Sequence, residues 1–139
     1  MKNDKRIIFL AGPMRGISRE RSLAWRIKAI ELLGSDFQVL HALRGREERE
    51  TFPDPRAAVA RDKDDIRRAD IVLVDDTWPN AGMIGTAMEV LFAFELGKIV
   101  FLFGNAHRGD YWLENHSHGR FTDLEEVCDF IIKQFKMLF

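Results

Sequence analysis

The apolar run IIFLAGPMRG at residues 7–16 decides the fold. Five apolar residues, 7–11, are followed at once by Gly12 and Pro13, which end a regular element. A short continuous apolar run that stops at such turn residues is typical of a strand buried on both faces. We therefore predict a strand over residues 7–11 and a tight turn over residues 12–16.

Outward from this strand, apolar runs alternate with helical patterns. Runs at 37–41, 69–75 and 99–103 predict three more strands, and helices are expected at 18–33, 56–68, 84–96 and from 122 onward. Apolar strands that alternate with helices favour a parallel sheet covered on both faces. The predicted fold class is α/β, a flavodoxin- or Rossmann-like three-layer sandwich over residues 1–139. Its parallel sheet has four or five strands in the order 2-1-3-4, with at most one extra edge strand.

Local signals place the helix ends and the loops. Ser18 is a predicted N-cap, and Leu23, Ile27 and Ile30 share one face of the helix that follows. Thr122 is the predicted cap of the last helix. Residues 42–55 and 104–121 are expected to be polar loops, and loops of this length are often functional.

Composition excludes several classes of protein. The chain has 139 residues, 46% of them hydrophobic and 31% charged, which suits a globular domain and is too apolar for disorder. No apolar run could span a membrane, and the first one is too short for a signal peptide. The single cysteine, Cys128, rules out an internal disulfide and is expected to be a packing residue. These features predict a cytoplasmic protein.

The small net charge of −1 conceals an asymmetry between the two halves. Residues 1–61 carry 13 Lys and Arg against 8 Asp and Glu, whereas residues 62–139 carry 8 against 14. No basic block interleaves with aromatic residues, so a nucleic-acid polymer is not the expected partner. A small anionic ligand near the N-terminal half remains compatible with this pattern.

Ligands of parallel α/β sheets bind at the carboxyl ends of the strands. This rule points to residues 12–16, to residues 75–85 and to the loop after Phe103. In the first stretch the predicted binding residues are Gly12, Pro13, Met14, Arg15 and Gly16. Glycines let backbone N–H groups approach an anion and Arg15 adds a positive fork; the alternative is a tight turn with a solvated arginine.

Two carboxylates stand out by their positions on predicted helices. Glu89 lies near the start of a helix that is apolar nearly all round, so it has few ways to point into water. Asp62 lies three residues after Val59 and four before Ile66, on their apolar face. A buried carboxylate needs a partner or a task, so we predict Glu89 as a nucleophile or base and Asp62 as a cleft residue. The alternative for Glu89 is a structural ion pair or a capping contact.

The neighbouring acidic residues give weaker signals. Asp64 and Asp65 are expected to have structural roles only, with Asp64 on a solvated charged face. Asp75 could accept a hydrogen bond from a sugar hydroxyl or simply form a turn. Trp78 could stack on a base or cover the sheet edge.

The remaining candidates for chemistry are histidines. His116 and His118 alternate in a polar loop, but no acidic or cysteine partner lies at ligand spacing. Because zinc sites need such partners, a surface loop is favoured over a metal site there, and no metal is predicted.

Three segments together resemble the nucleoside 2-deoxyribosyltransferase-like superfamily. They are residues 9–16 (FLAGPMRG), residues 62–72 (DKDDIRRADIV), and residues 85–100, where GTAME is followed by Ala93 and GKIV. The resemblance covers most of residues 6–103. It implies N-glycosidic bond chemistry on a nucleoside or its 5′-monophosphate, without a cofactor. Gly85 and Thr86, which open the helix bearing Glu89, are expected to contact the substrate.

The resemblance also implies roles for the two carboxylates. Glu89 would attack the anomeric carbon and form a glycosyl-enzyme intermediate, as in a retaining glycosidase. Asp62 would position Glu89 and protonate the leaving base. Water as the acceptor gives hydrolysis, and a second base gives transfer. Members usually form dimers or larger assemblies, so residues 106–120, with His116 and His118, are expected to reach a neighbouring copy.

The chain departs from the nucleoside 5′-monophosphate N-hydrolases of this superfamily at three positions. Pro13 stands where they have a serine, Phe9 where they have a tyrosine, and Met83 where they have another serine. The transferases tend to have an acidic residue near position 83. The base, the sugar, the need for a 5′-phosphate and the acceptor are therefore open. The alternatives are a non-catalytic nucleotide-binding module on the same fold and a phosphoribohydrolase-type enzyme.

Overall fold

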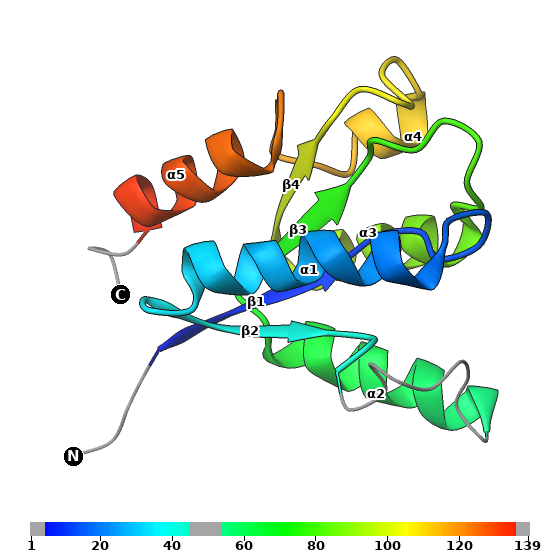
Figure 1. Ribbon diagram of the computed structural model, residues 1–139, viewed down its shortest axis with the longest axis horizontal. Helices are drawn as coiled ribbons and strands as arrows, with labels where there is room; N and C mark the ends of the chain where they lie inside the picture. The colour runs from blue at the N-terminus through cyan, green and yellow to red at the C-terminus, as the bar shows by residue number, and fades with distance from the viewer. Residues whose placement is uncertain (1–4, 45–53, 136–139) are drawn as a thin grey trace.

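A five-stranded parallel sheet with helices on both faces forms the framework of the computed structural model, which describes residues 5–44 and 54–135 (Figure 1). The strands are β1 (Arg6–Ala11), β2 (Phe37–His41), β3 (Ile71–Asp75), β4 (Ile99–Phe103) and β5 (Gly119–Phe121). The helices are α1 (Arg19–Leu33), α2 (Pro55–Arg68), α3 (Ile84–Glu95), α4 (Tyr111–Glu114) and α5 (Leu124–Phe135). The spatial order β2-β1-β3-β4-β5 confirms the predicted order 2-1-3-4 with one added edge strand.

Alternate residues of each strand pack into two separate cores. Ile8 and Leu10 of β1 face the core under α1 and α5, whereas Phe9 and Ala11 face the core under α2, α3 and α4. All four side chains are at most 1% exposed. The central strands are therefore buried on both faces, which is why they contain no alternation of polar residues.

Residues 104–121 contain more regular structure than the predicted polar loop. Asp110 caps α4 by accepting a hydrogen bond from the Leu113 backbone N–H at 3.0 Å, and Leu113 packs into the core under α2 and α3. Strand β5 then pairs with β4, Gly119 opposite Phe101. A four-residue helix and a three-residue strand are too short to produce a periodic signal, so local sequence patterns do not reveal them.

Two further expectations about helices need correction. The Ser18 cap of α1 is confirmed, since its Oγ accepts from the Arg21 N–H at 3.2 Å, but the buried face of α1 is not the predicted one. Ile27 and Ile30 are exposed, and the residues buried along this helix are Ser22, Arg26, Ala29 and Leu33. At α5, Asp123 rather than Thr122 accepts from a first-turn N–H, that of Glu126, at 2.9 Å.

The position of α2 is fixed by a buried ion-pair cluster. Asp65, only 1% exposed, accepts hydrogen bonds from both terminal nitrogens of Arg44, which follows β2, and from Arg68 at 2.9 Å. The cluster ties the C-terminal half of α2 to the end of β2. Asp65 is thus a buried structural residue, whereas Asp64 is exposed beside Arg68 as predicted.

Asp65→Ala is expected to lower the free energy of unfolding by about 2–4 kcal/mol in urea denaturation. The loss leaves two arginines without their shared carboxylate, but both reach solvent at 32% and 46% side-chain exposure, which moderates the cost. The matched control is Asp64→Ala, one residue away on the exposed face, with an expected loss below about 0.5 kcal/mol. Equal effects of the two variants would show that the buried cluster does not hold α2.

The expected loop over residues 42–55 is described only at its two ends, because residues 45–53 lie outside the described residues. Within residues 5–44 and 54–135, no helix combines the length and the apolar character needed to cross a membrane.

Candidate active site

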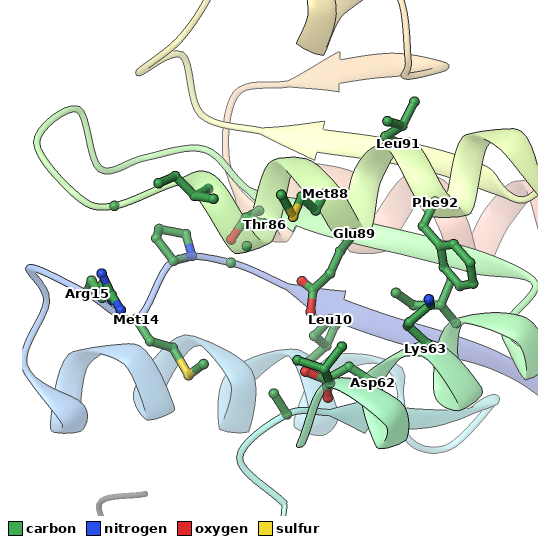
Figure 2. A pocket seen from close by; sticks show the side chains of 18 of the residues that line it. Leu10, Met14, Arg15, Asp62, Lys63, Thr86, Met88, Glu89, Leu91 and Phe92 are labelled. Atoms are coloured by element: carbon green, nitrogen blue, oxygen red, sulfur yellow. The ribbon is translucent and has the colours of Figure 1, made fainter. Parts of the chain in front are cut away.

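A cavity of about 880 Å³ lies between α2 and α3, beside the carboxyl end of β1 (Figure 2). Its walls come from the turn after β1, from α1, from the residue after β2, and from the facing sides of α2 and α3. The strand order reverses between β1 and β3, so the cavity lies at the switch point where ligands of such sheets bind. Its volume falls within the roughly 300–1,000 Å³ that encloses small-molecule ligands.

Eight of the predicted site residues line this cavity: Gly12, Pro13, Met14, Arg15, Asp62, Gly85, Thr86 and Glu89. Gly16, Asp75 and Trp78 are not among the lining residues. Much of the remaining wall is apolar and exposed, with Val59, Ile84, Met88 and Leu91 between 41% and 74% accessible. An apolar wall around a few polar groups is typical of small-molecule sites.

The turn after β1 is held close to the loop before α3. The Gly82 N–H donates to the carbonyl of Arg15 at 3.0 Å, and a Cβ on Gly82 would lie 3.1 Å from the Cβ of Arg15. Gly12 is required by packing, because a Cβ there would lie 2.9 Å from the Trp25 ring and 3.1 Å from the Cβ of Asp75. The backbone of Arg15 is therefore fixed while its side chain, at the cavity wall, stays exposed.

Glu89 and Asp62 form the polar centre of the cavity. Figure 2 shows their side chains reaching from α3 and α2 into the space between the two helices. The two carboxyl groups share a hydrogen bond, which requires a proton on one of them. Burial first, and then the negative charge of Asp62, raises the pKa of Glu89 to about 8. Near neutral pH the pair therefore holds one proton and one negative charge.

Local sequence accounts for both positions. Thr86, Val90 and Ala93 form the buried side of α3, and Glu89 precedes Val90 at the edge of that side, facing α2. Asp62 lies between Val59 and Ile66 on the side of α2 that lines the cavity, as its spacing predicts. The geometry thus brings together the two carboxylates that were singled out from helix patterns.

Arg26 is a cavity-lining residue that sequence analysis missed. Its side chain is 1% exposed and its charge acts on Glu89, Asp75 and Asp62. Burial lowers the pKa of its guanidinium to about 10, so it remains a cation at neutral pH. One sequence signal could have revealed it. Residues 22, 26, 29 and 33 recur at helical spacing and so share one face of the helix, and the only charged residue among these small and apolar ones is Arg26.

Asp75 and Trp78 are engaged with each other rather than with the cavity. The buried carboxylate of Asp75 accepts from the Thr77 N–H at 3.0 Å, the Thr77 hydroxyl at 2.5 Å and the Trp78 indole N–H at 2.8 Å. Burial raises the pKa of Asp75 above its ordinary value, while these hydrogen bonds oppose the rise. Contacts of Asp75 and Trp78 with a sugar or a base therefore stay predictions that the cavity geometry does not favour.

The predicted histidine loop packs on α3. The rings of His116 and His118 lie 5.1 and 5.2 Å from the ring of Phe94, and His118 Nδ1 accepts from the Val100 N–H at 2.9 Å. Within the described residues, no group of three or more His, Cys, Asp or Glu side chains is arranged to hold a metal ion. Whether this loop reaches a second copy of the chain stays a prediction.

Comparison of the sequence with protein-family models and with curated proteins finds no match. Solved structures are similar over nearly the whole chain. A 2-deoxyribosyltransferase from Bacillus psychrosaccharolyticus has a TM-score of 0.72 at 23% identity, covering 95% of each chain. A 2-deoxyribosyltransferase from Leishmania mexicana has a TM-score of 0.69 at 17% identity, covering 94% of this chain and 99% of that one.

A third similar structure is a CMP N-glycosidase from Clostridium botulinum, with a TM-score of 0.61 at 18% identity, covering 91% of this chain and 97% of that one. Each of the three likenesses covers more than nine-tenths of the chain. The chain therefore shares the α/β fold of these two 2-deoxyribosyltransferases and of the CMP N-glycosidase, in agreement with the fold class that the sequence predicts.

Proposed function

We propose that this protein is an enzyme that cleaves the N-glycosidic bond of a nucleoside or of its 5′-monophosphate. The observation that carries the proposal is the hydrogen-bonded pair of Glu89 and Asp62 at the centre of a cavity with mostly apolar walls. Support comes from the shared fold, since solved structures with this fold include two 2-deoxyribosyltransferases and a CMP N-glycosidase.

The pair supplies both groups that the reaction needs. Moving the shared proton from Glu89 to Asp62 across their hydrogen bond gives a carboxylate nucleophile beside a carboxylic acid. A Glu89 oxygen then forms a bond to the anomeric carbon as the bond from that carbon to the base nitrogen breaks. Asp62 gives its proton to the departing base, which leaves a glycosyl ester on Glu89.

The second step regenerates the enzyme. A water molecule or a second base attacks the anomeric carbon of the ester, and the bond to Glu89 breaks with its electron pair returning to the carboxylate. Asp62, now ionised, accepts the proton that the incoming nucleophile loses. Water yields the free sugar and a base yields a new nucleoside, so the same two carboxyl groups serve hydrolysis and exchange.

Base release from a panel of substrates tests the proposal. The protein is incubated with nucleosides and their 5′-monophosphates, in ribo and deoxy forms, with and without a second free base, and the products are separated by chromatography. Free base that depends on Glu89 supports the proposal, and a new nucleoside identifies transfer. Thermal stabilisation by a nucleotide with no release from any substrate would instead favour the non-catalytic binding module.

Arg15 is the proposed contact for a 5′-phosphate, because it is a cation on the cavity wall with a fixed backbone. Arg15→Gln is expected to raise the KM for 5′-monophosphates about 10-fold or more, since charge-assisted hydrogen bonds contribute about 1.5–3 kcal/mol. The KM for nucleosides should stay within about twofold. Steady-state kinetics on both substrate classes measures the difference.

The control for Arg15 is Arg6→Gln, which removes an exposed arginine at the amino end of β1, outside the cavity lining. This variant should leave both KM values unchanged. An equal rise of KM for nucleosides and for monophosphates in Arg15→Gln would contradict a phosphate contact and assign Arg15 to the sugar or the base.

A further inference from the structure

We propose that Arg26 is a positioning residue of this site: its fixed, buried guanidinium keeps the Glu89–Asp62 pair at one negative charge and one proton. The inference rests on the proposed function for its catalytic meaning. The effect of the Arg26 charge on the two carboxyl groups involves only residues that line the same cavity, so this effect can be tested without a substrate. Three observations support it.

The first observation is that the guanidinium is held rigidly. Nη1 donates to the Ser22 carbonyl at 2.7 Å and to the Ser22 hydroxyl at 2.9 Å, and Nη2 donates to the Gly12 carbonyl at 3.0 Å. Its carbon lies 4.8 Å from the centre of the Trp25 ring. A planar fork bound at both terminal nitrogens has little freedom to turn, so the positive charge has a fixed position between α1 and the turn after β1.

The second observation is that these direct partners are all neutral oxygens. A buried cation without a nearby negative charge is strongly disfavoured. The negative charges that act on Arg26 are those of Glu89, Asp75 and Asp62. Asp75 already accepts three hydrogen bonds from its own loop. The carboxyl pair is therefore the counter-charge of Arg26 that faces the cavity.

The third observation is an unsatisfied donor. Within the described residues, the buried Nε of Arg26 has no hydrogen-bond acceptor. An unmade hydrogen bond in a buried position is costly, so the hydrogen bonds of this side chain do not by themselves account for its burial. We attribute the presence of an arginine on this face of α1 to the position of its positive charge rather than to the hydrogen bonds that it makes.

The charge balance follows from the groups around the pair. Among the described residues, the charged side chains that line the cavity with the pair are Arg26 from α1, Arg15 from the turn before α1, and Lys63 and Glu95 farther along the wall, while Asp75 from β3 acts on Arg26. With Arg26 present, one carboxyl group of the half-buried pair ionises readily, but a second ionisation would place two negative charges in contact. Removing Arg26 takes away a positive charge that opposes the effect of burial on Glu89, and this change favours the form of the pair with two protons and no nucleophile.

The test compares Arg26→Gln, which keeps a donor but removes the charge, with Arg26→Lys, which keeps the charge. The carboxyl carbons of 13C-labelled Glu and Asp are titrated by NMR in each protein, with Glu89→Gln to assign the pair. In Arg26→Gln the lower titration of the pair should rise by about one pH unit or more. In Arg26→Lys it should stay within about half a unit of the wild type.

The pH profile of kcat/KM for base release should move in the same way, with the acid limb of Arg26→Gln displaced upward and restored in Arg26→Lys. Lys28→Gln, which removes an exposed charge from the same helix, is the matched control and should move neither readout. A purely structural role predicts lower activity at every pH with unchanged titrations, and that result would overturn the inference.

Two further outcomes are distinguishable. If Arg26→Gln does not fold, Arg26→Lys still decides, because a rise of its lower titration by more than one unit would overturn the inference. If the wild-type protein releases no base but the titrations move as expected, the inference about charge is supported and the proposed function is overturned.

Discussion

Glu89→Gln is expected to lower kcat/KM for base release by about three orders of magnitude or more, because the amide cannot form the glycosyl ester. Glutamine has nearly the same shape and can still hydrogen-bond to Asp62, so the cavity between α2 and α3 should be preserved. Substrate affinity should therefore change by less than about tenfold. Steady-state kinetics gives the first quantity, and calorimetric titration of the variant gives the second.

The covalent step itself can be detected. Wild-type protein quenched in acid during turnover should gain the mass of the sugar, or of the sugar phosphate, in intact-mass spectrometry. Glu89→Gln should gain none. The control is Glu31→Gln, an exposed glutamate of α1, which should behave as the wild type. A sugar adduct on the Glu89→Gln protein would assign the nucleophile to another residue.

The two carboxylates that the structure places in the cavity, as the sequence predicts, were recognisable from periodicity within a single element. Helix α3 is so apolar that Glu89 had almost no solvent-facing alternative, and Asp62 shares its face with Val59 and Ile66. The sheet was predictable for a similar reason, because a strand buried on both faces is apolar at every position. Each of these signals lies in ten or fewer consecutive residues.

The parts that could not be predicted depend on contacts between distant segments. Arg26 belongs to the site because Gly12, 14 residues earlier, offers it a carbonyl. Its burial contradicts the usual preference of arginine for the surface. The apolar side chains of Ile27 and Ile30 predict a different buried face of α1, but both are exposed. Asp75 was nominated by its place at the sheet edge, but its own loop supplies its hydrogen bonds, which spacing cannot show.

The prediction of a polar loop after β4 was wrong for a different reason. Helix α4 and strand β5 together comprise seven residues, and both depend on pairing or packing against β4 and α3. Elements this short have no stability of their own, so their sequence need not carry a pattern. The fold around the cavity is therefore encoded locally, whereas the edge of the sheet is encoded by tertiary contacts.

Asp62→Asn is expected to lower kcat/KM for ordinary nucleosides by about 10²–10⁴, the usual contribution of a general acid. Asparagine keeps a polar group next to Glu89 but has no carboxylic proton to give to the departing base. The matched control is Asp64→Asn, two residues away on the exposed face of α2, which should leave the kinetics unchanged. Chromatographic assays of base release measure both variants.

The leaving group separates the two roles proposed for Asp62. A purine methylated at N7 carries a positive charge in the nucleoside and departs as a neutral base without a proton. For such a substrate Asp62→Asn should lose less than about tenfold if Asp62 acts mainly as the acid. Equal losses for ordinary and methylated purines would contradict the acid role and leave Asp62 as a residue that positions Glu89.

The pH dependence provides an independent check of the same assignment. In the wild type, loss of the shared proton near the Glu89 pKa of about 8 removes the acid, so kcat/KM for ordinary nucleosides should fall above that pH. For an N7-methylated purine this alkaline fall should be absent, because only an ionised Glu89 is needed. In Asp62→Asn the negative neighbour is gone, so the pKa of Glu89 decreases and its nucleophilic form extends to lower pH. A wild-type alkaline fall that is identical for both leaving groups would show that the proton on the pair is not the one delivered to the base.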